Sequence, residues 1–158
     1  MPPVVGTPDD VLSRPAQEAP VSVQLNAYLN FDTATREAME FYRSVLGGTL
    51  DVMTFGDYGA EGDAAGLVMH AQLVTDDGFV LMASDRTPEM GAVVRGEQTH
   101  LCLNGDDVDR LHRWWEGLGE GGTVHMALEK QMWGDEYGDL TDRFGQRWMF
   151  NIALGGQA

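Results

Sequence analysis

Aromatic and acidic side chains gather in the C-terminal third of the chain, where they could form a binding site. The group consists of three aromatic residues and four acids: Trp133, Tyr137, Trp148, Glu129, Asp135, Glu136 and Asp142. Aromatic walls with a few polar groups are typical of small-ligand sites. A dimer interface or an aromatic core explains the same composition, so these alternatives stay open. Carboxylates can transfer protons, but exposed acids are common in so acidic a chain, and no catalytic residue is assigned.

Histidine is the second residue type that could carry chemistry, as a metal ligand or as an acid-base group. His70, His112 and His125 have no partner at the spacing of metal ligands, and we expect structural or surface roles for them. His100 lies on the polar side of a predicted strand. It is either a site residue or a histidine that is hydrogen-bonded to a neighbour such as Asn26.

Charge and composition exclude several classes of partner. The formal net charge of −15 repels phosphate backbones and anionic lipid headgroups, so we expect neither nucleic acid nor a membrane as a partner. No stretch approaches about 20 apolar residues, and the N-terminus lacks the pattern of a secretory signal. The single cysteine, Cys102, excludes an internal disulfide and a thiolate metal cluster. These features together predict a cytoplasmic protein.

Hydrophobic periodicity predicts the elements that position these residues. Residues 23–31 alternate between apolar and polar side chains, as in a strand with one buried face. Asp32 or Thr33 is the expected N-cap of an amphipathic helix that ends at Gly47 and Gly48. Three strand-like runs follow, so the predicted order is βαβββ. The runs are 49–55, 67–75 and 78–85.

The second half of the chain repeats this order. It contains a predicted strand at 99–104, a helix capped by Asp106 or Asp107, and three further strands. LNFD at 29–32 matches LNGD at 103–106, and GGT at 47–49 matches GGT at 121–123 at the same offset. Two helices flanked by strands also arise by chance in α+β domains, but the shared segments favour an internal duplication.

The repeat predicts an α+β fold of two tandem βαβββ modules. Their sheets are expected to curl around a shared cleft, with helices covering the outer apolar faces. We expect a flexible Pro-rich tail at 1–21 and a single domain at 22–153, with modules at 22–86 and 97–153.

Six ordered segments resemble the PhnB-like branch of the vicinal oxygen chelate (glyoxalase) superfamily. They are LNAYLNFD at 25–32, AMEFY at 38–42, MTFGD at 53–57, LMASD at 81–85, WGDEYG at 133–138 and TDRFGQRWMFNI at 141–152. The resemblance implies the paired βαβββ fold and, usually, a homodimer. Some members are labelled methyltransferases, but no strand here leads into a Gly-x-Gly turn that opens a helix, so no cofactor is expected.

The resemblance also identifies four positions that hold a metal in metal-dependent members of the superfamily. These positions correspond to Asn26, Met82, His100 and Met149. A hard divalent ion prefers imidazole, carboxylate or water, whereas a thioether offers a soft neutral sulfur. Only His100 is a plausible ligand, so no metal site is expected.

The favoured hypothesis is a small-molecule-binding protein whose specific activity is unknown. The expected cleft is lined by Asn26, Tyr28, Met82, Ser84, His100, Trp133, Met149 and Asn151. The two methionines suit a shape-tolerant apolar pocket, although methionine also fills cores. The alternative is a metal-dependent glyoxalase-like or dioxygenase-like enzyme that uses His100 with ligands from elsewhere. A third hypothesis is a dimer that binds other proteins without a ligand. Whether the chain is an enzyme stays open.

Overall fold

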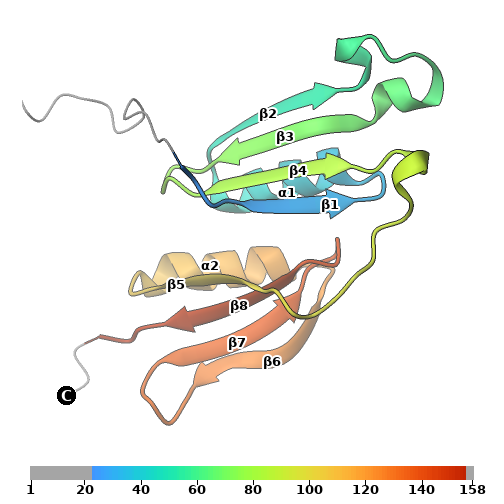
Figure 1. Cartoon of the computed structure of the whole chain (residues 1–158). Helices are drawn as coiled ribbons and strands as arrows, with labels where there is room; N and C mark the ends of the chain where they lie inside the picture. Colours follow the sequence, from blue (N-terminus) through green and yellow to red (C-terminus); the bar gives the residue numbers. More distant parts are fainter. Residues whose placement is uncertain (1–22, 156–158) are drawn as a thin grey trace, which may run out of the picture.

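The computed structural model describes residues 23–155, which form two successive βαβββ modules (Figure 1). The first contains β1 (Ala27–Phe31), α1 (Thr35–Leu46), β2 (Thr49–Thr54), η2 (Gly56–Tyr58), η3 (Gly62–Gly66), β3 (Val68–Val74) and β4 (Val80–Asp85). The second follows η4 (Pro88–Met90) and contains β5 (Leu101–Gly105), α2 (Val108–Gly119), β6 (Thr123–Lys130), β7 (Glu136–Thr141) and β8 (Arg147–Ile152). The tail predicted at 1–21 lies outside the described residues. Within that described range no helix has the length and apolarity to cross a membrane.

The strands form two separate mixed sheets of four strands each. The N-terminal sheet has the order β1-β4-β3-β2, and the C-terminal sheet has the equivalent order β5-β8-β7-β6. In each sheet the first strand pairs in parallel with the last, and the remaining pairs are antiparallel. The predicted α+β fold of two βαβββ modules is confirmed.

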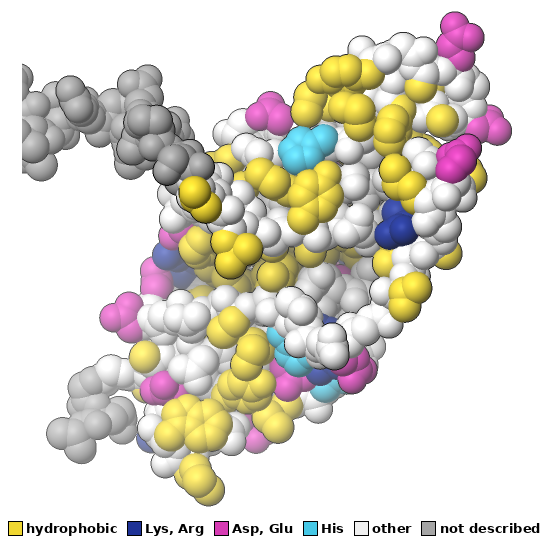
Figure 2. Space-filling view, viewed as in Figure 1, with side chains coloured by type: hydrophobic (Ala, Val, Ile, Leu, Met, Phe, Trp, Pro, Cys, Tyr) yellow, Lys and Arg dark blue, Asp and Glu magenta, His cyan; other side chains and the backbone are white. Residues whose placement is uncertain are grey.

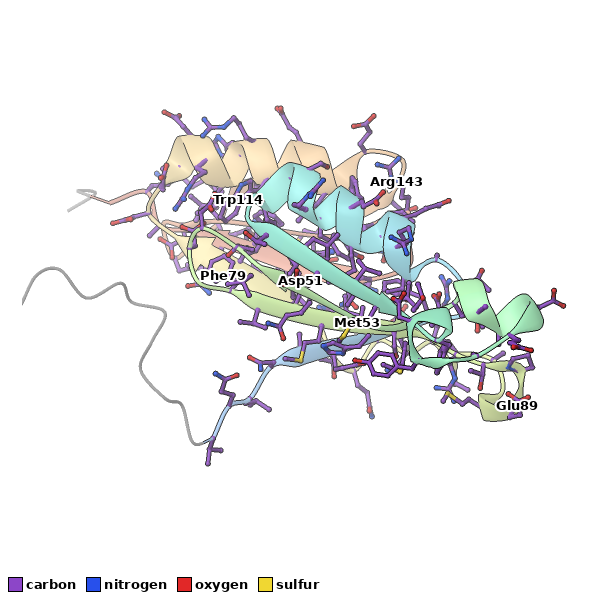
Figure 3. All side chains as sticks on the ribbon, turned by 90° about the horizontal axis from the view of Figure 1, so that it is seen from above. Asp51, Met53, Phe79, Glu89, Trp114 and Arg143 are labelled. Atoms are coloured by element: carbon purple, nitrogen blue, oxygen red, sulfur yellow. The ribbon has the colours of Figure 1, made fainter. Side chains whose placement is uncertain are left out.

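Both helices cover the same side of the molecule, as Figures 1 and 3 show from two directions. The apolar and polar residues of β1 point to opposite faces, as predicted. Leu29 and Phe31 are buried in the core, whereas Tyr28 and Asn30 are exposed on the opposite face. We call the faces of the two sheets that lie opposite the helices the open faces. The polar strand residues of the sequence pattern therefore line the open faces.

The start of α1 differs from the prediction. Its N-cap is Ala34, which makes no side-chain capping bond, so neither Asp32 nor Thr33 is the cap. The buried carboxylate of Asp85, at the end of β4, accepts the backbone N–H of Thr35 at 3.0 Å instead. A capping oxygen supplied by a distant strand leaves no local signal. In α2 the predicted cap Asp107 is confirmed by its bond from the Arg110 N–H.

Each helix also packs against a turn of the other module. Tyr42 of α1 donates a 2.7 Å hydrogen bond to Asp142 in the β7–β8 turn. In return, Arg110 of α2 lies 2.8 Å from Asp77 in the β3–β4 turn, and Trp114 meets Phe79 there edge to face. These reciprocal contacts join the two modules through buried and half-buried groups. One cluster of buried apolar side chains includes residues from both modules.

Candidate functional site

The open face of the N-terminal sheet brings together three of the predicted site residues. Tyr28 lies opposite Met82 on the paired strands β1 and β4, and Ser84 follows two residues later on the same face. His70 of β3 joins them, because its Nδ1 shares a 3.0 Å hydrogen bond with the Tyr28 hydroxyl. His70 was assigned no binding role from the sequence. His70 and Gln72 are two positions apart in the predicted strand, so the sequence indicates that they share a polar face. The strand order that places His70 beside Tyr28 is not encoded locally.

The open face of the C-terminal sheet brings together two more predicted site residues, Trp133 and Asn151. The Trp133 indole N–H donates to the Asn151 side-chain oxygen at 3.4 Å, and the Asn151 amide donates to Asp135 at 2.9 Å. Tyr137 lies opposite Asn151 on the neighbouring strand, and its ring meets Trp133 edge to face. Trp133 remains 58% exposed, so more than half of its side-chain surface is accessible to a ligand.

Met149 lies beside a set of charged and titratable groups on the same open face. It is opposite Cys102 on one side and Asp139 on the other. Desolvation, followed by the negative charge of Asp139, raises the pKa of Tyr137 above its usual value. The Tyr137 hydroxyl is therefore a neutral hydrogen-bonding group at neutral pH. Arg147 balances the local charge through a 3.2 Å contact with Asp139.

Asn26 and His100 lie just outside the strands in which we expected them. Each is half-buried and immediately precedes a strand, β1 for Asn26 and β5 for His100. The Asn26 amide donates to Gln24 at 3.2 Å, so the bond to His100 suggested by the sequence is not formed. Across residues 23–155, no three histidine, cysteine or acidic side chains are grouped closely enough to hold a metal ion. The four positions that the resemblance identified carry one amide, one imidazole and two thioethers, which is not the donor set that a hard divalent metal prefers.

The aromatic and acidic group of the C-terminal third divides between the site and the core. Trp148 is 2% exposed and donates its indole N–H to the buried carboxylate of Asp142 at 2.9 Å. The aromatic-core alternative is therefore correct for Trp148, whereas Trp133 and Tyr137 lie at the open face. Glu136 lies 2.7 Å from the Nε2 of His112, so its carboxylate contacts α2 and not the open face.

A cleft of about 520 Å³ lies between the two modules. It is lined by residues 27–32 of the first module, by 144–146 and Leu101 of the second, and by linker residues between 93 and 99. Of the eight predicted site residues only Tyr28 lines this cleft. Residues of both modules thus line one cleft. The other seven predicted site residues do not line it.

The sequence of this chain is similar to those of a known family and of a curated relative. Residues 24–150 match the family described as the Glyoxalase/Bleomycin resistance protein/Dioxygenase superfamily. Protein YjdN from Escherichia coli (strain K12) is 30% identical over 141 residues, covering 81% of this chain and 94% of YjdN.

Two solved structures show the same fold. Protein PA1353 from Pseudomonas aeruginosa superposes with a TM-score of 0.73 at 40% identity, covering 84% of this chain and 98% of that one. The PhnB protein from Bacillus cereus superposes with a TM-score of 0.65 at 20% identity, covering 83% and 100%. The superfamily recognised from the six sequence segments is confirmed. The chain belongs to the glyoxalase/bleomycin resistance protein/dioxygenase superfamily.

Proposed function

We propose that this protein binds a small organic molecule at its open sheet faces, without a metal, as a homodimer. The observation that carries the proposal is the exposed Trp133 beside the Tyr137 ring: its indole N–H donates to Asn151, whose own amide donates to Asp135. A fixed aromatic surface with nearby hydrogen-bonding groups is what recognition of a small ligand requires. Tyr28 and His70 form a second such group on the N-terminal sheet.

The chemistry of the donors favours binding over metal-dependent catalysis. Met82 and Met149 occupy two of the four positions that would hold a metal, and they place polarizable thioethers among the aromatic groups. Such side chains adapt to ligands of different shape, whereas they are poor ligands for zinc, manganese or nickel.

Cys102 is exposed and has no disulfide partner among the described residues, which fits the reducing cytoplasm.

The exposure of the open faces supports the homodimer. Figure 2 shows hydrophobic side chains gathered over both sheets on this side of the molecule. Among the large hydrophobic side chains of the chain, Tyr28 is 45%, Met126 48% and Trp133 58% exposed. Apolar surface of this kind marks interaction sites in soluble proteins. A second copy that covers part of this surface would enclose a ligand that a single open sheet cannot surround. The presence of four tryptophans in so short a chain also favours a homodimer but is weaker support, because Trp114 and Trp148 are buried within the chain.

Binding at the open faces can be tested with a set of aromatic fragments by 1H–15N NMR. The proposal expects saturable shifts at amides of β1, β4, β7 and β8, and it expects Trp133→Ala to abolish the shifts on the C-terminal sheet. Met132→Ala is the matched control, because this neighbouring side chain is fully exposed at 100%. Shifts that spare all four strands, or that persist in Trp133→Ala, would contradict the proposal.

The oligomeric state needs a separate measurement. Light scattering coupled to size exclusion at micromolar protein concentration is expected to give twice the 17.3 kDa chain mass. Trp133→Asp, which places a charge on the open face, is expected to shift the mass toward one chain. A monomeric wild type would remove the homodimer from the proposal.

A further inference from the structure

The cleft between the modules contains one cation without a partner. Arg95, in the linker, lines this cleft, and no carboxylate of residues 23–155 lies within ion-pair distance of its guanidinium. By contrast, Arg110 and Arg147 each have acidic partners. Most arginines of residues 23–155 have no carboxylate within ion-pair distance, so what distinguishes Arg95 is that the cleft lining includes its guanidinium. The guanidinium has five donors available for an anion.

The Arg95 guanidinium lies against Gly145 of the second module. The guanidinium lies so close to Gly145 that a side chain at that residue would meet it, with the Arg95 Cζ only 2.8 Å from the position of an added Cβ. Gly145 also has a φ of 92°, which favours glycine in the β7–β8 turn. The turn thus leaves room for the guanidinium at the edge of the cleft.

Two bonds hold the linker on either side of Arg95. The Asp32 carboxylate accepts the backbone N–H of Val93 at 2.9 Å, and Glu97 lies 3.3 Å from Arg147. The linker segment that carries Arg95 is therefore attached to the first module at one end and to the second module at the other. Attachment at both ends reduces the conformational entropy that Arg95 would lose when it binds an anion.

The rest of the cleft lining is apolar or neutral, with one exception. Leu29, Phe31, Leu101 and Phe144 contribute hydrophobic side chains, and Gln98 contributes an amide. The exception is Asp32, the one acid among the described lining residues. Arg95 is the one cation among the described lining residues, so it can offset the charge of one carboxylate but not both charges of a dianion.

We infer that the cleft binds a small monocarboxylate with an apolar body, whose carboxylate pairs with Arg95 and whose body contacts Phe31, Phe144 and Leu101. Arginine binds a carboxylate through two parallel N–H···O bonds, which gives orientation as well as affinity. The volume of about 520 Å³ lies within the range of small-molecule pockets. The cleft shares Tyr28 and Asn30 of β1 with the open face of the N-terminal sheet, but neither Trp133 nor Tyr137 lines it, so the inference does not depend on the function proposed for that aromatic group.

The test compares three probes by 1H–15N NMR titration of the full chain. Phenylacetate carries the expected charge and apolar body, phenylacetamide has the same shape without the charge, and inorganic phosphate has charge without the apolar body. Saturable shifts at residues 93–99 and 144–146 are expected with phenylacetate. Binding of phenylacetamide and of phosphate is expected to be weaker by roughly tenfold or more. Equal binding of phosphate would overturn the monocarboxylate assignment.

Two arginine variants distinguish binding by Arg95 from a general effect of the charge of the protein. Arg95→Gln is expected to weaken phenylacetate binding by roughly tenfold or more, with an unchanged melting temperature. Arg43→Gln removes the same charge from an exposed position on α1 and is expected to leave binding unchanged. Absence of saturable shifts, or equal losses in both variants, would overturn the inference. The amides of β7 and β8 report separately on the open faces, so either proposal can fail alone.

Discussion

Asp142 holds four hydrogen bonds at the contact between the modules. One carboxylate oxygen accepts from the Tyr42 hydroxyl and the Trp148 indole, and the other accepts the backbone N–H groups of Phe144 and Gln146. The residue is only 3% exposed, so water cannot replace a lost partner. The sequence placed Asp142 among the candidate site acids, but its four donors assign it a structural role. This assignment depends on a contact between residues 100 positions apart, which no local pattern encodes.

Replacing Asp142 with asparagine should destabilise the fold by roughly 2–4 kcal/mol. The amide group offers one acceptor oxygen, and its NH2 would face donors that need an acceptor. Asp51→Asn removes the same charge from an exposed site on β2, and its effect should stay within about 0.5 kcal/mol. Urea unfolding of both variants measures the difference. Equal effects would contradict the structural role of Asp142.

Tyr42 gives the stability a predictable dependence on alkaline pH. Burial, followed by the charge of Asp142, raises the pKa of Tyr42 well above its usual value. Below about pH 10 the phenol is neutral in both folded and unfolded chains, so it adds no pH dependence there. Above that pH the unfolded phenol ionises and the folded one does not, so stability falls. The stability advantage of wild type over Tyr42→Phe should therefore shrink between about pH 9 and pH 11, as urea titrations can show. An advantage that stays constant over this range would contradict the account.

At the scale of elements, the sequence predicts what depends on neighbouring residues. Alternation over 23–31 identifies which side chains face the helices and which face outward, and the observed strand agrees from Ala27 to Phe31. The cap of α2 is local, and Asp107 was one of the two residues predicted for it, Asp106 being the other; the capping oxygen of α1 comes from Asp85 and was not predicted. The pairing of Tyr28 with His70, 42 positions apart, also depends on strand order. Local periodicity therefore predicts faces, and tertiary pairing decides which groups meet.

The repeated GGT segment has a steric cause that both modules share. A Cβ at Gly122 would collide with the Thr141 carbonyl oxygen, and one at Gly48 would collide with that of Val74. Gly122→Ala should therefore cost roughly 2 kcal/mol or more, because backbone atoms cannot move aside. Gly66→Ala is the control, since nothing lies within 4 Å of its added Cβ. It should be neutral or stabilising by up to about 1 kcal/mol. Equal melting temperatures for the two variants would refute the steric explanation.

At the scale of the whole molecule, the modules are expected to unfold together. The Tyr42–Asp142 and Arg110–Asp77 contacts cross between them, and their buried side chains form one cluster. Loss of either module would expose apolar surface of the other, and loss of the N-terminal module would also remove the Tyr42 hydroxyl from the buried Asp142 carboxylate. Differential scanning calorimetry should give one transition whose calorimetric and van't Hoff enthalpies agree. Two separate transitions would mean that each module is its own folding unit.

The central claim is that this member of the superfamily binds an organic ligand without a divalent metal at the positions equivalent to metal ligands. Of those positions only His100 offers a good donor, and one histidine holds zinc weakly because affinity needs several converging ligands. The most direct measurement is titration calorimetry with zinc on wild type and His100→Ala. The account predicts no binding tighter than about 1 µM in either protein. Tighter binding to the wild type that His100→Ala abolishes would contradict the claim and favour a metalloenzyme.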